Sequence, residues 1–290
     1  DQLTAHSQLA AQNTTPADAG AANAALPLAN EAAQRQAIRA YLTMQSQVEE
    51  AAFPLYVIVE KILSETEPLP PEWTVHGTTG YDFVSAANNL FVDSSAAKTF
   101  DGIYSHFIGR TIDFEQLVSD SKAMIMRISL SSEINTLGRE LERINEQNRR
   151  YRDFTLNGLI DALREVIVCL PIYRTYTVAG ASVSPRDRQY LEGAIAKAKR
   201  RSPQTASSVY DFVRDVLLLR NLNEFAESAR PQVVNFVMKF QQVTGPVMAK
   251  SVEDTAFYVY NRLVSLNEVG GQPRIFGLSL DAFHRQNSER

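Results

Sequence analysis

The sequence predicts a mainly α-helical protein, a helical bundle attached to a small α/β segment. Between Thr99 and Val243 apolar residues recur at helical spacing, and few strand-like runs interrupt them. By contrast, Leu55–Val59 (LYVIV) is an uncharged run of aromatic, β-branched and aliphatic residues, typical of a short strand buried on both faces of a parallel sheet. This run ends abruptly at Glu60 and Lys61.

Length and composition exclude several classes of protein. The 290 residues, 44% of them hydrophobic, can bury a large core and form one large or two ordinary domains. The net charge of −4 lacks the basic surplus of a nucleic-acid binder, and we expect no nucleic-acid partner. We also expect no membrane partner and no signal peptide, since no stretch is long and apolar enough. Cys169 is the one cysteine, and this favours a reducing, cytoplasmic compartment. We expect its side chain to be small, apolar and buried.

The N-terminal part of the chain is predicted to change character several times. Residues 1–29 are rich in Ala, Gln, Asn and Thr, and we expect a flexible, low-complexity insert. A helix is expected from about Asn30 to Val48, ahead of the strand. After the strand we expect a rigid loop, an irregular glycine-bounded loop, a helix and a break, in the order Leu69–Glu72, His76–Gly80, Tyr81–Leu90 and Asp93–Asp101.

The central part is predicted to be helical throughout. Phe114–Asn148 is expected as one long helix, or as two helices that break near Ser131 and Ser132. Its apolar stripe is Ile134, Leu137, Leu141 and Ile144, opposite Arg139, Glu140, Arg143 and Glu146. Further helices are expected at Phe154–Leu170 before Pro171, after the Ser184 cap with Pro185, at Ser207–Arg220 and at Val233–Val243. The basic run Lys197–Arg201 fits a helix C-terminus better than a nucleic-acid patch.

The chemistry that the sequence offers is that of carboxylates. It has no phosphate-binding GxxxxGK[ST] loop, no GxSxG elbow, no HExxH and no paired cysteines, and its four histidines are scattered. Glu60 directly follows the predicted strand, and catalytic side chains of (β/α)₈ barrels lie at the carboxyl ends of strands. Glu60 is therefore a candidate acid. The alternative is that Glu60 and Lys61 begin a solvated loop.

Two long motifs resemble one known family. VIVEKIL followed by WTVHGTTGYDF, and TGPVMAKSVEDTAFYVYNRLVSLNEVGG at Thr244–Gly271, are similar to the maltooligosyltrehalose synthases, a branch of the α-amylase family. The resemblance implies a fragment of a (β/α)₈ TIM barrel that carries a helical insertion. The expected segments are the insert at 1–29, a barrel-derived αβ fragment at 30–98, the helical insertion at 99–243 and an active-site-flanking segment at 244–290.

The resemblance also implies a reaction, an intramolecular transglucosylation. The reducing-end α-1,4 linkage of a maltooligosaccharide becomes an α,α-1,1 (trehalose) linkage through a covalent glycosyl-enzyme, without metal or organic cofactor. Glu60 matches the general acid/base. The aspartate nucleophile in its R-x-D context and the later H-D motif have no match in this sequence. We therefore expect an internal fragment that is inactive alone and that needs the missing barrel strands of its parent chain.

Other residues in the two motifs are expected to bind the sugar: Trp73, His76, Tyr81, Asp82, Lys250, Glu253, Asp254, Tyr258 and Arg262. Alternatives remain for some, namely that Tyr258 and Tyr260 belong to the core and that Glu253 pairs with Arg262. The sequence departs from the family pattern at Ser251 and Val259, where Gly and Arg are expected; a serine there would stiffen a turn. Two other functions stay open, an α-amylase-family hydrolase such as a trehalose-releasing enzyme, and a non-catalytic helical module that binds sugar or has a structural role.

Overall fold

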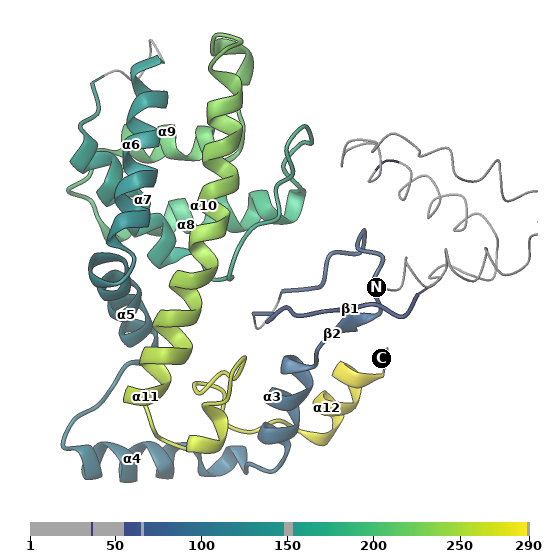
Figure 1. The fold of residues 1–290 in the computed structure, drawn as a ribbon. Helices are drawn as coiled ribbons and strands as arrows, with labels where there is room; N and C mark the ends of the chain where they lie inside the picture. Colours follow the sequence, from purple (N-terminus) through teal and green to yellow (C-terminus); the bar gives the residue numbers. More distant parts are fainter. Residues whose placement is uncertain (1–35, 37–54, 65–66, 148–152, 289–290) are drawn as a thin grey trace, which may run out of the picture. The chain divides into compact units, whose positions relative to one another are not determined.

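The structure is a computed structural model that describes residues 36, 55–64, 67–147 and 153–288 (Figure 1). The chain divides into two units, 1–57 and 58–290, and every element described below belongs to the second. The insert predicted at 1–29 lies outside the described residues. So does the helix predicted at 30–48, except for Gln36, which is helical. The division into four segments stays a prediction.

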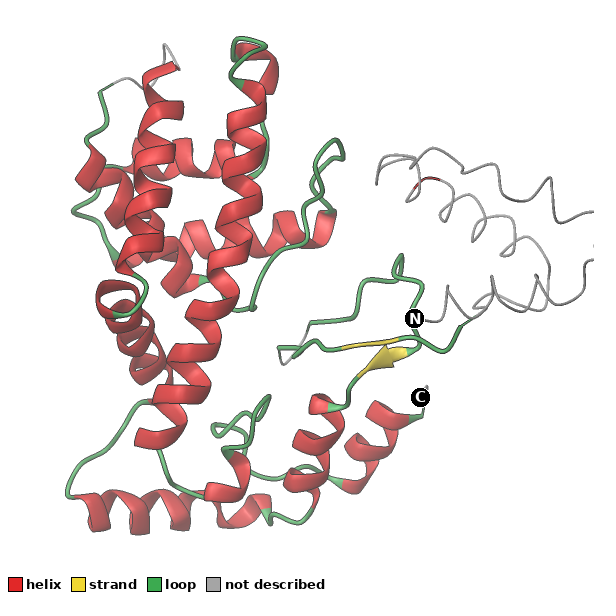
Figure 2. Ribbon diagram, viewed as in Figure 1, coloured by secondary structure: helices red, strands yellow, loops and turns green. Residues whose placement is uncertain are grey.

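Two short strands form a parallel pair. β1 (Ile58–Val59) lies beside β2 (Gly77–Thr78), with Ile58 opposite Gly77 and Val59 opposite Thr78 (Figure 2). The prediction of a doubly buried strand over Leu55–Val59 is wrong, because only its last two residues are strand and Ile58 is 46% exposed. In the described residues the sheet has two strands, and Leu55 and Tyr56 ahead of β1 are exposed. The loop predicted at 76–80 contains β2.

The first helices after the strands agree only in part with the sequence. α3 (Tyr81–Leu90) has the predicted bounds and follows Gly80, whose φ of 99° is left-handed. The break predicted over 93–101 is largely helical, with η1 (Ser94–Ala96) running into α4 (Ala97–Ile108). Asp93 explains the difference, because its side chain accepts a hydrogen bond from the Ser95 amide and so caps a helix start instead of ending a helix.

Longer helices make up most of the remaining described residues (Figure 1). They are α5 (Phe114–Ile128), α6 (Ser131–Gln147), α7 (Leu156–Cys169), α8 (Pro185–Arg201), α9 (Ser207–Leu217) and α10 (Arg230–Ser251), with the short η2 (Leu222–Glu224) before α10. The mainly helical prediction is confirmed, and so is the break near Ser131. None of the helices in the described residues combines the length and apolarity that a membrane span requires.

α7 lies in the middle of the apolar core. It packs against α5, α6, α8 and α9, and the predicted stripe of α6 is buried. α8 begins as predicted, because the Ser184 hydroxyl accepts a hydrogen bond from the Asp187 amide and Pro185 occupies the first turn. The basic run stands in the last turn of α8, where cations complement the helix dipole. Cys169 is a buried free thiol, as predicted.

The second motif forms an unusual helix end. α10 runs past the predicted end at Val243, through Pro246, and continues as the π-helical turn η3 (Val252–Ala256) and then α11 (Phe257–Val259). The Thr255 hydroxyl donates to the Lys250 carbonyl at 2.8 Å within this turn. Ser251 is the last residue of α10 and is fully buried. The turn expected at this position is therefore wrong. The last elements of the described residues are η4 (Val264–Leu266) and α12 (Leu280–Asn287).

Candidate active site

Glu60 and Tyr81 meet at the carboxyl ends of the two parallel strands. Glu60 follows β1 and Tyr81 begins α3 just after β2, so both lie at the same edge of the sheet. The Tyr81 hydroxyl donates a hydrogen bond to Glu60 Oε1 at 3.0 Å. This hydrogen bond is the main cause of the raised pKa of Tyr81. The phenol therefore stays protonated and acts as a donor to the exposed carboxylate of Glu60.

Lys61 anchors the segment that follows Glu60. Its ammonium is buried and lies 2.7 Å from Glu67 Oε1, which Arg186 of α8 also contacts at 3.2 Å. Burial lowers the pKa of Lys61, against the opposing effect of its bond to Glu67. The alternative of a solvated loop start is therefore wrong for Lys61, while Glu60 beside it is exposed. Two successive residues thus point to opposite environments, one to the interior and one to solvent.

Trp73 packs against a cluster of cations around Tyr176. Its indole meets the Tyr176 ring edge to face, with 4.7 Å between ring centroids. Arg174, Lys61 and Arg186 also lie over the Tyr176 ring, at 5.0, 5.1 and 5.6 Å from its centroid. Trp73 is half-buried in this arrangement, and its contact with sugar stays a prediction.

Glu253 of the second motif contacts Tyr173 and lies near Tyr81 of the first motif. It lies in the π-helical turn η3 and accepts a hydrogen bond from the hydroxyl of Tyr173, a residue 80 positions earlier in the chain. The charge of Glu253 contributes to the raised pKa of Tyr81, so the two side chains are electrostatic neighbours. Sequence reasoning missed Tyr173, because nothing in its local pattern indicates a contact across 80 residues. The alternative that Glu253 pairs with Arg262 is wrong, because Arg262 pairs with Asp101.

Gly270, near the end of the second motif, packs closely against Tyr81. Its φ of +76° is left-handed, and a Cβ at this position would lie 2.9 Å from Cβ of Tyr81. A side chain here would therefore be strained and would also displace Tyr81. Packing against Tyr81 thus explains the first glycine of the pair that ends the second motif.

Arg262 and Tyr258 lie in other environments. The Arg262 guanidinium pairs with Asp101 at 2.7 Å, donates to the Pro273 carbonyl at 2.7 Å and lies 4.6 Å from the centroid of the Phe276 ring. Tyr258 is 77% exposed, so the alternative of a core role is wrong for it, whereas Tyr260 is buried.

The other predicted sugar contacts have local partners or face solvent. Lys250 and Asp254 form an exposed pair at 2.6 Å, one helical turn apart. Asp82 accepts a hydrogen bond from the Thr78 hydroxyl at 3.1 Å, which ties the start of α3 to the end of β2. His76 is exposed. Sugar binding by these four residues, as by Tyr258 and Arg262, stays a prediction.

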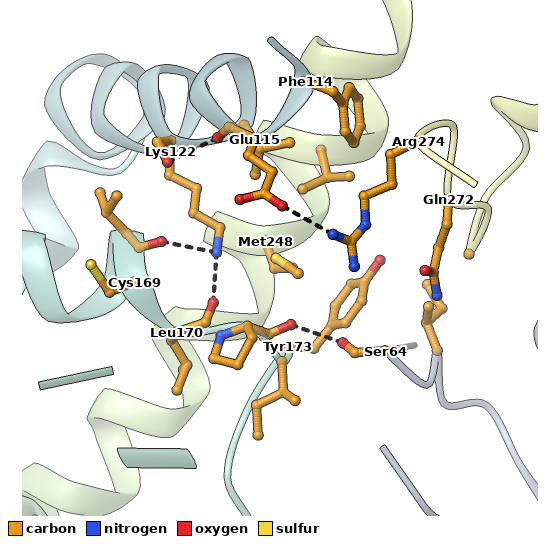
Figure 3. Close-up of a pocket in the computed structure, with 18 of the residues that line it drawn as sticks. Ser64, Phe114, Glu115, Lys122, Cys169, Leu170, Tyr173, Met248, Gln272 and Arg274 are labelled. Carbon is orange, nitrogen blue, oxygen red and sulfur yellow. Dashed lines mark hydrogen bonds and ion pairs between the residues drawn. The ribbon is translucent and has the colours of Figure 1, made fainter. Parts of the chain in front are cut away.

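A cavity of about 410 Å³ adjoins this site (Figure 3). Its wall is mostly apolar and comes from α5, α7, α10 and the segments around Ser64 and Gln272, with Tyr173 on one side. Lys122 is buried there and donates to the carbonyls of Leu170 and Val168 at 2.7 and 3.4 Å, so it caps the end of α7. Burial lowers the pKa of Lys122 to about 8.

Comparisons with known proteins point to the family that the two motifs resemble. No protein-family model matches the chain. A Mycobacterium tuberculosis (strain ATCC 25618 / H37Rv) protein with the provisional name maltooligosyl trehalose synthase is 29% identical over 235 residues, which are 81% of this chain and 27% of that protein. The maltooligosyltrehalose synthase of Arthrobacter ramosus has a structure that matches 87% of this chain and 29% of its own, with 32% identity and a TM-score of 0.65.

A third similar structure, from Sulfolobus tokodaii, is described as a hypothetical maltooligosyl trehalose synthase. It matches 87% of this chain and 28% of its own, with 28% identity and a TM-score of 0.59. The chain thus spans less than a third of the length of these relatives.

Catalytic side chains of barrel enzymes lie at the carboxyl ends of parallel strands, and Glu60, which accepts a hydrogen bond from Tyr81 at the start of α3, has this position. More particularly, the chain is similar to one part of the maltooligosyltrehalose synthases, and the resemblance predicted from the motifs is confirmed.

Proposed function

We propose that this chain is part of a glucosylmutase, an isomerase of the α-amylase family that rebuilds the reducing end of maltooligosaccharides. The reducing-end α-1,4 linkage would become an α,α-1,1 linkage by transfer within one substrate molecule. The observation that carries the proposal is the hydrogen bond from Tyr81 to Glu60 at the ends of two parallel strands, within the first motif of a chain that is similar to the maltooligosyltrehalose synthases.

Glu60 is the proposed general acid/base. It first protonates the glycosidic oxygen of the leaving glucose, while an aspartate outside this sequence attacks the anomeric carbon and forms a covalent glycosyl-enzyme. The released glucose then turns and presents its anomeric hydroxyl, and Glu60 removes the proton as that oxygen attacks. Two displacements at one carbon retain the α configuration.

The helical stretch 99–243 has a proposed task in this reaction. A hydrolase admits water to the glycosyl-enzyme, whereas a mutase must keep the glucose in place and exclude water. Two contacts support a covering role, because Tyr173 and Arg186 reach from the helical stretch to Glu253 and Glu67 respectively. We propose that the helical stretch and the two motifs together form this cover.

The test uses the complete polypeptide that contains this chain and analyses the linkage of the products formed from maltopentaose. The proposal expects a product of unchanged length that ends in an α,α-1,1 linkage, and its loss in Glu60→Gln. Products of shorter length from the unaltered protein would contradict the mutase and favour a hydrolase. An unaltered rate in Glu60→Gln would contradict the role of Glu60.

A further inference from the structure

We infer that Tyr173 is a positioning residue for Glu253, and that this pair determines whether the released glucose is re-attached or lost. The inference rests on the proposed function and goes beyond it, because it assigns a side chain of the helical stretch to one step. In that step the anomeric oxygen of glucose bonds to the anomeric carbon of the enzyme-bound chain. The bond from that carbon to the nucleophile carboxylate breaks, and the hydroxyl proton passes to Glu60.

The geometry first shows why Tyr173 fixes Glu253. Tyr173 stands in the segment between α7 and α8, with Pro171 two residues before it, and its ring forms part of the cavity wall in Figure 3. Its hydroxyl donates to one oxygen of Glu253. Burial, and then this bond, raises the pKa of Tyr173 far above its ordinary value, so the hydroxyl remains a donor over the whole working pH range.

The position of Glu253 then shows what is being held. Glu253 is in the π-helical turn η3, and π-helical turns inside helices are frequent at functional sites. Its charge acts on Tyr81, which donates to Glu60, so the two carboxylates flank one pair of tyrosines. A carboxylate has about four acceptor positions, and one hydrogen bond from Tyr173 leaves the others for sugar hydroxyls.

These contacts explain why the pair would affect one product more than the other. Cleavage of the first linkage needs Glu60 and the nucleophile, whereas Tyr173 donates its hydrogen bond to Glu253 and not to Glu60. Re-attachment needs in addition that glucose stays and turns, which requires hydrogen bonds to its hydroxyls from an oriented acceptor. A hydrogen bond to a charged group stabilises by about 1.5–3 kcal/mol, equivalent to roughly tenfold or more in a partition ratio.

The experiment measures free glucose and trehalose-ended product together, in the complete polypeptide with maltopentaose. Tyr173→Phe is expected to raise the ratio of glucose to trehalose-ended product by about tenfold, and Glu253→Gln by at least as much. The double variant should match Glu253→Gln alone, because Tyr173 acts through Glu253. A ratio is the right measure, since misfolding lowers both products equally.

Tyr176→Phe is the matched control, because it removes a hydroxyl from the same segment while its contacts with Trp73 and Arg174 are made by the ring. It should leave the ratio unchanged. An unaltered ratio in Tyr173→Phe or in Glu253→Gln, or additive effects in the double variant, would overturn the inference and leave the proposed function in place. If the unaltered protein forms no trehalose linkage, the proposed function fails and the inference falls with it.

Discussion

The phenol of Tyr81 donates a hydrogen bond to the carboxylate of Glu60 at 3.0 Å, and it thereby joins the ends of two parallel strands. The two residues come from the two parts of the first motif, 21 positions apart. This relationship gives the exposed carboxylate a fixed donor on the protein side and leaves its other lone pairs for a ligand.

The first prediction follows from this bond. In the complete polypeptide, Tyr81→Phe should lower kcat/KM for maltopentaose by about tenfold, because it removes one hydrogen bond to a charged group. Glu60→Gln should lower it by about 10²–10⁴-fold, the range for loss of a general acid/base. Steady-state kinetics measure both. If Tyr81→Phe has the same kcat/KM as the unaltered protein, the hydrogen bond has no part in catalysis.

The second prediction compares two lysine–carboxylate pairs of similar length. Lys61 and Glu67 are buried at 2.7 Å, whereas Lys250 and Asp254 are exposed at 2.6 Å. Lys61→Met should lower the free energy of unfolding of the 290-residue chain by about 3 kcal/mol, because Arg186 would then be the remaining cation beside this buried carboxylate in the described residues. Lys250→Met, the matched control, should leave the free energy of unfolding nearly unchanged, because water screens an exposed pair. Urea unfolding distinguishes the two, and equal effects would show that burial is not the cause.

The third prediction concerns pH and Lys122. Its pKa is about 8 in the folded protein and the ordinary 10.5 when unfolded, so the unfolded chain binds more protons between these pH values. The free energy of unfolding should therefore rise by about 3 kcal/mol from this residue as pH increases from 8 to 10.5. Below pH 8 the destabilisation is fully present. Lys122→Met should remove this rise, and a rise that persists in the variant would have another source.

The fourth prediction uses two glycines with opposite surroundings. Gly270 has a φ of +76° and faces Cβ of Tyr81, while Gly102 lies in α4 with open space where a Cβ would lie. Gly270→Ala should destabilise the 290-residue chain by more than about 1 kcal/mol. Gly102→Ala should stabilise it by about 0.5–1 kcal/mol, because alanine favours a helix. Thermal unfolding measures both signs, and a neutral Gly270→Ala would contradict the described packing on Tyr81.

Local signals in the sequence were sufficient for several elements. The Ser184 cap with Pro185 locates the start of α8, and the periodic residues after Tyr81 locate α3. The start of α4 differs from the prediction because Asp93 and the serines after it resemble a loop, although Asp93 caps η1 ahead of α4. The strand was overestimated because its β-branched run continues outside the ladder, which holds only Ile58 and Val59. The residues at which a strand begins and ends depend on the backbone that it pairs with, and not on residue propensity alone.

The candidate site was predictable only where the family motifs reach. The motifs identified Glu60, Tyr81 and Glu253, which the structure brings together. They gave no sign that a π-helical turn carries Glu253, since helix type at this position depends on how α10 packs. Tyr173 could not be found, because its contact with Glu253 connects distant parts of the chain. Long-range contacts of this kind need the folded structure.

The central claim is tested most directly by following reducing ends and free glucose together while the complete polypeptide acts on maltopentaose. The account predicts that reducing ends disappear while little glucose forms, because the terminal unit is re-attached head to head within the same molecule. A gain of reducing ends, accompanied by free glucose, would mean that water takes the glycosyl-enzyme. That result would contradict the mutase and the covering role of the helical stretch.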